Sequence, residues 1–117
     1  MNSKRLLQIA ALVDKNDSVV DVGCDHGYLS IYLKQNNCCK NIIASDINNN
    51  ALNNAINNFK KYQLIIDTYL SDGFDKIEEY FDTAVIAGMG TSTILNIINN
   101  SKCPDKLILS SNNDYYL

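Results

Sequence analysis

Apolar residues along this chain follow two alternating patterns. Short apolar runs bounded by polar and turn residues are typical of strands buried within a sheet. Runs of this kind cover residues 18–22, 41–46, 63–70, 83–87 and 106–109. Between them, apolar residues recur every three or four positions, as on the buried face of a helix. This spacing predicts helices over residues 3–13, 27–35, 48–61 and 74–81, and a further helix that Thr91 or Ser92 caps.

Strands that alternate with helices predict an α/β fold. Each strand would reach the next one through a helix, so the sheet should be mostly parallel and doubly wound, with helices on both faces. Ser3 is a possible N-cap of the first helix. In such sheets ligands bind just outside the carboxyl ends of the strands. We therefore expect the functional residues in the loops that follow the strands.

The loop after the first strand is the most informative. Its sequence, DVGCDHGYL, places Gly23 and Gly27 where the backbone must turn tightly. A dinucleotide-binding fingerprint would have glycine at positions 23, 25 and 28, whereas this chain has Gly23, Asp25 and Tyr28. A carboxylate at Asp25 would repel a pyrophosphate but suits a cationic ligand. S-adenosylmethionine carries an ammonium and a sulfonium group and no phosphate at that end, so we expect it in preference to a nicotinamide dinucleotide.

Other strand ends carry acids and glycines as well. Asp46 lies 19 residues beyond Gly27, which is close to the separation at which an acid bonds a cofactor ribose in this architecture. The alternative is that Asp46 caps the helix that follows it. Asp72, in the sequence SDG, is a candidate acceptor for an adenine amino group or an ordinary turn residue. The sequence AGMG at 87–90 follows the fourth predicted strand.

Together these motifs resemble the bacterial tRNA (adenine(22)-N(1))-methyltransferases. The matching segments are SKRL at 3–6, DVGCDHGYL at 21–29, ASD at 44–46, DG at 72–73, IAGMG at 86–90, and LIL followed by Asn112 at 107–112. DHGYL and IAGMG are the most specific, because methyltransferases in general usually have glycine where Asp25 stands. The resemblance implies a Rossmann-like class I methyltransferase fold, S-adenosylmethionine as cofactor, and methyl transfer to N1 of an adenine in the D-arm of tRNA.

The resemblance also implies roles for individual residues. In the cofactor site, the first glycine turn would hold the methionine end, Asp46 the ribose, and Ile47 and Asp72 the adenine. The implied cofactor-binding residues are Asp21, Gly23, Cys24, Asp25, His26, Gly27, Asp46, Ile47, Asp72, Gly73, Ala87, Gly88 and Met89. The implied catalytic residues are Asp25, Arg5 and His26.

The chemistry expected at this site needs no strong base. N1 of adenine has an in-plane lone pair, so catalysis would rest on aligning N1 with the methyl group and the sulfur. Asp25 or backbone carbonyls near Ala87 and Gly88 could accommodate the charge that moves onto the adenine. The adenine must first be turned out of its stack, because N1 lies on its Watson–Crick edge.

Four residues of this site each have an alternative interpretation. Arg5 could contact a tRNA phosphate or hold the first helix over the cofactor, or it could be an ordinary solvated charge. His26 could accept a proton from the methylated base or only hydrogen-bond the turn. Tyr28 and Met89 could line the pocket for the target base, or they could be packing residues.

Charge and cysteine content limit the partners, the metal sites and the cellular location that we expect. The net charge of −3 argues against a strongly basic nucleic-acid surface, so local patches or another segment would hold the tRNA. The four cysteines show neither a disulfide framework nor the usual spacing of a metal site, so we expect free thiols and no bound metal. The chain has no 18-residue apolar run and no convincing signal peptide, so we expect a cytoplasmic protein without a membrane partner.

The length of the chain raises a question about its activity. We expect its 117 residues to form one S-adenosylmethionine-binding domain, 1–117. Compared with the family that it resembles, this domain should be C-terminally incomplete, without the last strands and the C-terminal helical domain. The strand at 106–109 would then be an open edge through which copies could associate. The alternative function is a non-catalytic cofactor-binding fragment or an RNA-associated binding module.

Overall fold

The computed structural model describes residues 3–100 and 103–111. Helices and strands alternate along this part of the chain, with the bounds α1 Ser3–Ala10, β1 Ser18–Val22, α2 Tyr28–Gln35, β2 Asn41–Asp46, α3 Asn49–Lys61, β3 Asp67–Leu70, β4 Thr83–Met89, α4 Thr91–Asn100 and β5 Lys106–Ser111. None of the helices within the described ranges is long and apolar enough to cross a membrane. Asn112, which belongs to one of the sequence motifs, lies outside the described residues.

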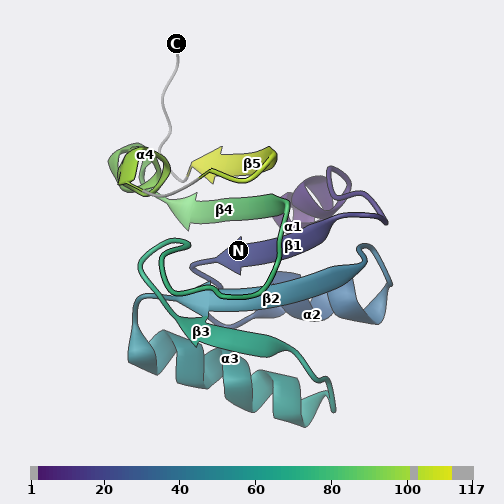
Figure 1. Ribbon diagram of the computed structural model, residues 1–117. Coiled ribbons are helices and arrows are strands. Elements are labelled where there is room, and N and C mark those ends of the chain that lie inside the picture. The colour runs from purple at the N-terminus through teal and green to yellow at the C-terminus, as the bar shows by residue number, and fades with distance from the viewer. Residues whose placement is uncertain (1–2, 101–102, 112–117) are drawn as a thin grey trace.

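The strands form one parallel sheet in the order β3-β2-β1-β4-β5 (Figure 1). β1 lies in the middle of the sheet, and all five of its residues are buried. The chain leaves β1 toward β2 and later returns to its other side as β4, so the winding direction reverses beside β1. This arrangement confirms the expected doubly wound, Rossmann-like α/β fold. In such folds the point of reversal, at the carboxyl end of β1, is where ligands bind.

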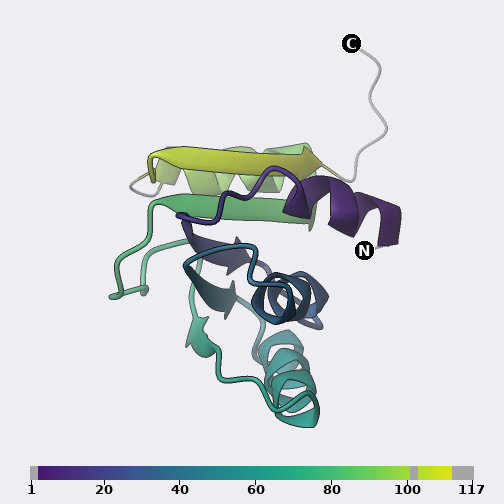
Figure 2. The ribbon, with the colours of Figure 1, turned by 90° about the vertical axis from the view of Figure 1, so that its right-hand side faces the viewer.

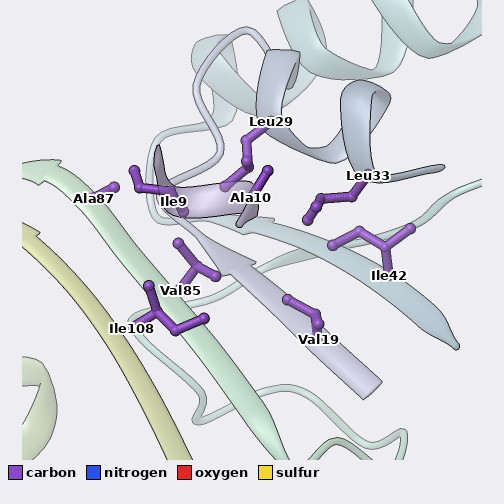
Figure 3. Close-up of a cluster of buried hydrophobic side chains, with 9 residues drawn as sticks. All are labelled: Ile9, Ala10, Val19, Leu29, Leu33, Ile42, Val85, Ala87 and Ile108. Carbon is purple, nitrogen blue, oxygen red and sulfur yellow. The ribbon is translucent and has the colours of Figure 1, made fainter. Parts of the chain in front are cut away.

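Both faces of the sheet are covered (Figure 2). On one face α1, α2 and α3 lie against the strands, and Ile9, Leu29 and Leu33 pack there on strand residues such as Val85 (Figure 3). On the other face α4 and the segment 71–82 pack on a second cluster, which includes Ile94. The central strands β2, β1 and β4 are therefore buried on both faces, which explains why their sequences are almost continuously apolar.

The predicted helix over 74–81 is absent, and that prediction was wrong. Phe74, Ile77 and Phe81 are spaced as on a helix, yet they pack on the sheet from an irregular segment, and the rings of Phe74 and Phe81 lie 5.6 Å apart. This segment must return alongside β4, whose seven residues extend over roughly 23 Å. A helix over 74–81 would span only about 12 Å. The length of the connection therefore favours a more extended path.

Side-chain hydrogen bonds, and not the backbone hydrogen bonds of a helix, stabilise this segment. The Ser71 hydroxyl donates to the Gly73 carbonyl at 3.1 Å and accepts the Lys76 N–H at 3.0 Å. Farther along, the Tyr69 hydroxyl of β3 donates to Oε1 of Glu79 at 2.9 Å. The segment is thus fastened at its start and near its end, with the aromatic contacts between.

Several element boundaries differ from the predictions. β3 begins at Asp67 instead of residue 63, because the end of α3 uses the residues between: Gln63 has a φ of +58°, and the Leu64 N–H donates to the Phe59 carbonyl at 2.9 Å. α1 ends at Ala10 instead of residue 13, and β4 and β5 each extend two residues farther than predicted. The expected caps of α4, residues 91 and 92, lie inside that helix.

Two buried serines give opposite expectations for stability. Within the described residues the Ser45 hydroxyl is fully buried and has no hydrogen-bond partner, whereas the Ser30 hydroxyl donates to Asp21 at 2.7 Å. Ser45→Ala should leave the free energy of unfolding unchanged or raise it by up to about 1 kcal/mol, and Ser30→Ala should lower it by about 1.5 to 3 kcal/mol. Urea denaturation of both variants measures the difference. Equal losses in the two variants would contradict this assignment.

Candidate functional site

Two pockets adjoin at the carboxyl end of the sheet. The larger pocket has a volume of about 350 Å³ and the smaller one of about 150 Å³. Gly23, the first residue after β1, lines both of them and marks their junction. The other residues of the larger pocket are Val22, Ile47, Ser71, Asp72, Gly73, Asp75, Met89, Thr93, Asn96 and Ile97. Those of the smaller pocket are Arg5, Asp21, Cys24, Asp25, His26, Tyr28, Leu29, Ala87 and Gly88.

The turn from β1 to α2 has an unusual backbone. Gly23, Asp25 and Gly27 all have positive φ angles, of +69°, +52° and +79°. Asp25 is the exceptional member, since residues with a side chain rarely adopt this conformation. A Cβ at Gly27 would lie 2.6 Å from Cε1 of Phe59 and 3.2 Å from Cβ of Ala55. Glycine at position 27 therefore lets α3 pack directly against the turn.

Neighbouring elements fix this turn from two sides. The Cys24 N–H donates to the Ser45 carbonyl of β2 at 2.9 Å. From α3, the Asn58 side-chain amide donates to the His26 carbonyl at 2.8 Å. These bonds come from residues far along the chain, so the shape of the turn depends on the assembled sheet.

Asp46, the last residue of β2, holds the backbone of two loops. Its Oδ2 accepts the Asp25 N–H at 3.0 Å, and its Oδ1 accepts the Asn48 N–H at 2.9 Å. The N-cap of α3 is Asn48, whose side chain accepts the Ala51 N–H at 3.0 Å. Asp46 is therefore not the cap of this helix, and the alternative interpretation of Asp46 from the sequence is wrong.

Asp21 is a buried carboxyl group beneath the turn. It is only 5% exposed and accepts the hydroxyl proton of Ser30 at 2.7 Å. Burial raises the pKa of Asp21 from 3.8 to about 6; the Ser30 hydrogen bond opposes this rise, and the charge of Asp46 adds to it. Ser30 is not among the residues expected from the sequence, because one serine in the first turn of a helix forms no recognisable motif.

The four cysteines are thiols outside any disulfide, as predicted: Cys24, Cys38, Cys39 and Cys103. Burial, followed by the charges of nearby carboxylates, raises the pKa of the Cys24 thiol far above its usual range. A thiol held in its neutral form is a weak nucleophile and a weak metal ligand, so Cys24 fills space in the turn. Across residues 3–100 and 103–111, no group of three or more His, Cys, Asp or Glu side chains could hold a metal ion.

The three residues expected in catalysis come together at the smaller pocket. The side chains of Asp25 and His26 are 68% and 50% exposed, and Nε2 of His26 lies 4.0 Å from Oδ1 of Asp25. The His26 ring stacks on Tyr28 with the ring centroids 5.4 Å apart. Arg5, from α1, lines the same pocket. The pocket therefore presents both signs of charge and an exposed aromatic surface.

The larger pocket contains residues that the sequence predicted and others that it did not. Ile47, Asp72 and Gly73, which the family resemblance implies as cofactor-binding residues, line it. Thr93 and Asn96 of α4 were missed, although they also line it. Their only signal in the sequence is two polar residues one helical turn apart, directly after a strand. That pattern is also typical of a solvated helix face, so it does not identify a pocket.

A β-bulge at the end of β4 distributes its residues between the two pockets. The register with β5 shifts between Ala87 and Met89, and Gly88 between them has a φ of +74°. In a regular strand Ala87 and Met89 would point to the same face of the sheet. The bulge instead places Ala87 in the cluster beneath α1 and α2, and Met89 against the cluster beneath α4. Ala87 and Gly88 consequently line the smaller pocket and Met89 the larger one.

The known proteins that are similar to this chain include methyltransferases, in agreement with the sequence motifs. The profile of the family described as "Methyltransferase domain" matches residues 2–117. A putative tRNA methyltransferase of Mycoplasma genitalium is 39% identical over 106 residues, which are 85% of this chain and 47% of that protein. The chain spans about half the length of the curated relatives that it matches.

Solved structures show the same similarity. TrmK of M. capricolum, in complex with S-adenosyl-homocysteine, is 38% identical with a TM-score of 0.86, over 97% of this chain and 54% of that one. A putative tRNA (m1A22) methyltransferase of Streptococcus pneumoniae, in complex with S-adenosyl-L-methionine, is 31% identical with a TM-score of 0.86, over 97% of this chain and 57% of that one. These matches support the family resemblance found in the motifs.

Asp21→Asn tests the state of the buried carboxyl group. Because the pKa of Asp21 is raised by folding, the stability that its proton contributes is complete below about pH 3.8 and is lost as the pH rises through about 6. Between pH 4 and pH 8 the wild type should therefore lose about 2 to 3 kcal/mol relative to the variant, whose amide does not titrate. Denaturation across this pH range measures the difference. Parallel profiles for the two proteins would show that Asp21 has an ordinary pKa.

Proposed function

The chain belongs to the methyltransferase domain family, and on this premise we propose that it binds S-adenosylmethionine across both pockets and transfers the methyl group to N1 of adenine 22 in tRNA. The observation that carries the proposal is the junction at Gly23 between a pocket of mixed charge and a larger one. The names of its relatives, a putative tRNA methyltransferase and a putative tRNA (m1A22) methyltransferase, support the substrate and the target atom. A tRNA substrate would place the protein in the cytoplasm.

The smaller pocket suits the methionine end of this cofactor. That end carries an ammonium, a carboxylate and a sulfonium group, so it needs partners of both signs. Asp21 and Asp25 offer carboxylates for the cationic groups, and Arg5 offers a guanidinium for the carboxylate. Gly23 lines both pockets and lets the ligand approach the backbone, while Gly27 supports the turn by letting α3 pack against it.

The larger pocket suits the adenosine end. Asp46 itself lines neither pocket, but the next residue, Ile47, lines the larger one. The Asp46 carboxylate accepts two backbone N–H groups, and each of its oxygens has a second acceptor site for a ribose hydroxyl. Ile47 would cover one face of the adenine, and Asp72 with Gly73 would meet its polar edge. A volume of about 350 Å³ is within the range of small-molecule sites.

The chemical role of the protein is mainly to orient the reacting groups. The cofactor supplies a methyl group on a cationic sulfur, which a lone pair can attack. The protein residues need not remove a proton before that attack, because N1 has an in-plane lone pair. The rim formed by His26 and Tyr28 and the backbone at Ala87 and Gly88 would orient a base that has left its stack. Asp25 would face the positive charge left on the base, and His26 would accept a proton from the amino group of the methylated adenine.

Two measurements on the full chain test the proposal in sequence. Calorimetric titration with S-adenosylmethionine measures cofactor binding. Incubation with unmodified tRNA and methyl-labelled cofactor, followed by nucleoside analysis, measures transfer; we expect labelled N1-methyladenosine, and none when guanine replaces adenine 22. Cofactor binding without any transfer would overturn the enzymatic function and favour a cofactor-binding module.

Asp46→Ala should weaken cofactor affinity by about 1 to 3 kcal/mol. The variant loses the hydrogen bonds proposed to the ribose and also releases the Asp25 N–H of the turn. Calorimetric titration of S-adenosylmethionine into the wild type and the variant measures the change.

Asp105→Ala is the matched control for this variant. It removes the same charge from an exposed position just before β5, at the opposite end of the strands from the two pockets. Its affinity should equal that of the wild type. If Asp46→Ala also kept the wild-type affinity, Asp46 would not belong to the cofactor site.

A further inference from the structure

Met89 lies at the junction between the two pockets. The bulge at Gly88 turns its side chain toward α4, and the end of that side chain lies directly over Gly23. The contact is so close that a Cβ at position 23 would collide with the Cε methyl group of Met89. Gly23 is also the residue that lines both pockets. A ligand that extends from one pocket into the other must therefore pass the thioether of Met89.

Of the two sides of this junction, Met89 is the adaptable one. Gly23 belongs to a turn whose next residue, Cys24, is hydrogen-bonded to the Ser45 carbonyl at 2.9 Å, so the backbone there is fixed to β2. Met89 is only partly buried, and its unbranched side chain can rotate about three bonds. Passage through the junction is therefore expected to displace the Met89 side chain and leave the glycine turn in place.

We infer that Met89 is a specificity-determining residue, which distinguishes ligands that fill only the larger pocket from ligands that span both. This inference rests on the proposed function, in which S-adenosylmethionine is the spanning ligand. A nucleoside held in the larger pocket leaves the contact between Met89 and Gly23 intact. A ligand whose sulfur crosses the junction must break that contact, so the contact lowers its affinity relative to that of the nucleoside.

The test compares two ligands on the full chain. Adenosine and S-adenosylmethionine are titrated into the wild type, Met89→Ala and Met89→Leu. Leucine ends one atom short of the methionine methyl group but keeps most of the packing beneath α4, so it preserves the fold if alanine does not. Both substitutions should raise the affinity for S-adenosylmethionine relative to adenosine about fourfold, the factor expected for the burial of one methyl group.

Ile47→Ala is the matched control. Ile47 lines only the larger pocket and is 68% exposed, so its loss should weaken both ligands alike and leave the affinity ratio unchanged. A wild-type chain that does not bind S-adenosylmethionine would overturn the proposed function itself. A wild-type chain that binds both ligands, with a ratio that stays constant or falls in the Met89 variants, would overturn the role of Met89 alone.

Discussion

The hydrogen bond from the Asp25 N–H to the Asp46 carboxylate is the contact on which the candidate site depends. It links the loop after β1 to the end of β2 at 3.0 Å, and it stabilises a backbone conformation at Asp25 that a residue with a side chain rarely adopts. Because Asp46 also accepts the Asn48 N–H that precedes α3, one carboxylate sets the relative positions of two loops. The smaller pocket is formed on the first of these loops.

Acidic groups gather at this edge of the sheet at a cost to the folded protein. Asp21 is buried close enough to Asp46 for their charges to interact, and its pKa is raised to about 6 as a result of burial and this repulsion. Ser30 offsets part of the cost through its hydrogen bond. A cationic group bound nearby would offset more of it. The arrangement that disfavours an ionised Asp21 in the free protein is thus the one that favours a positively charged ligand.

Local features of the fold and site could be predicted from the sequence, and long-range ones could not. Gly23 and Gly27 revealed the turn because the conformations that glycine allows are a property of the residue itself. The same reasoning failed for 74–81, where Phe74 and Phe81 have helical spacing but lie on an irregular segment. Ser30 and Asn96 were missed because their importance comes from neighbours that only the assembled sheet brings close.

The irregular crossover 71–82 forms one wall of the larger pocket, and we expect this wall to be less stable than the sheet. The crossover is stabilised by isolated hydrogen bonds, such as that between Tyr69 and Glu79, and not by the repeating backbone bonds of a helix. A cavity of about 250 Å³ also lies beside Phe74. Segments of this kind open at a lower free energy than the sheet that supports them. We therefore expect the wall that contains Asp72 to open before the strands separate.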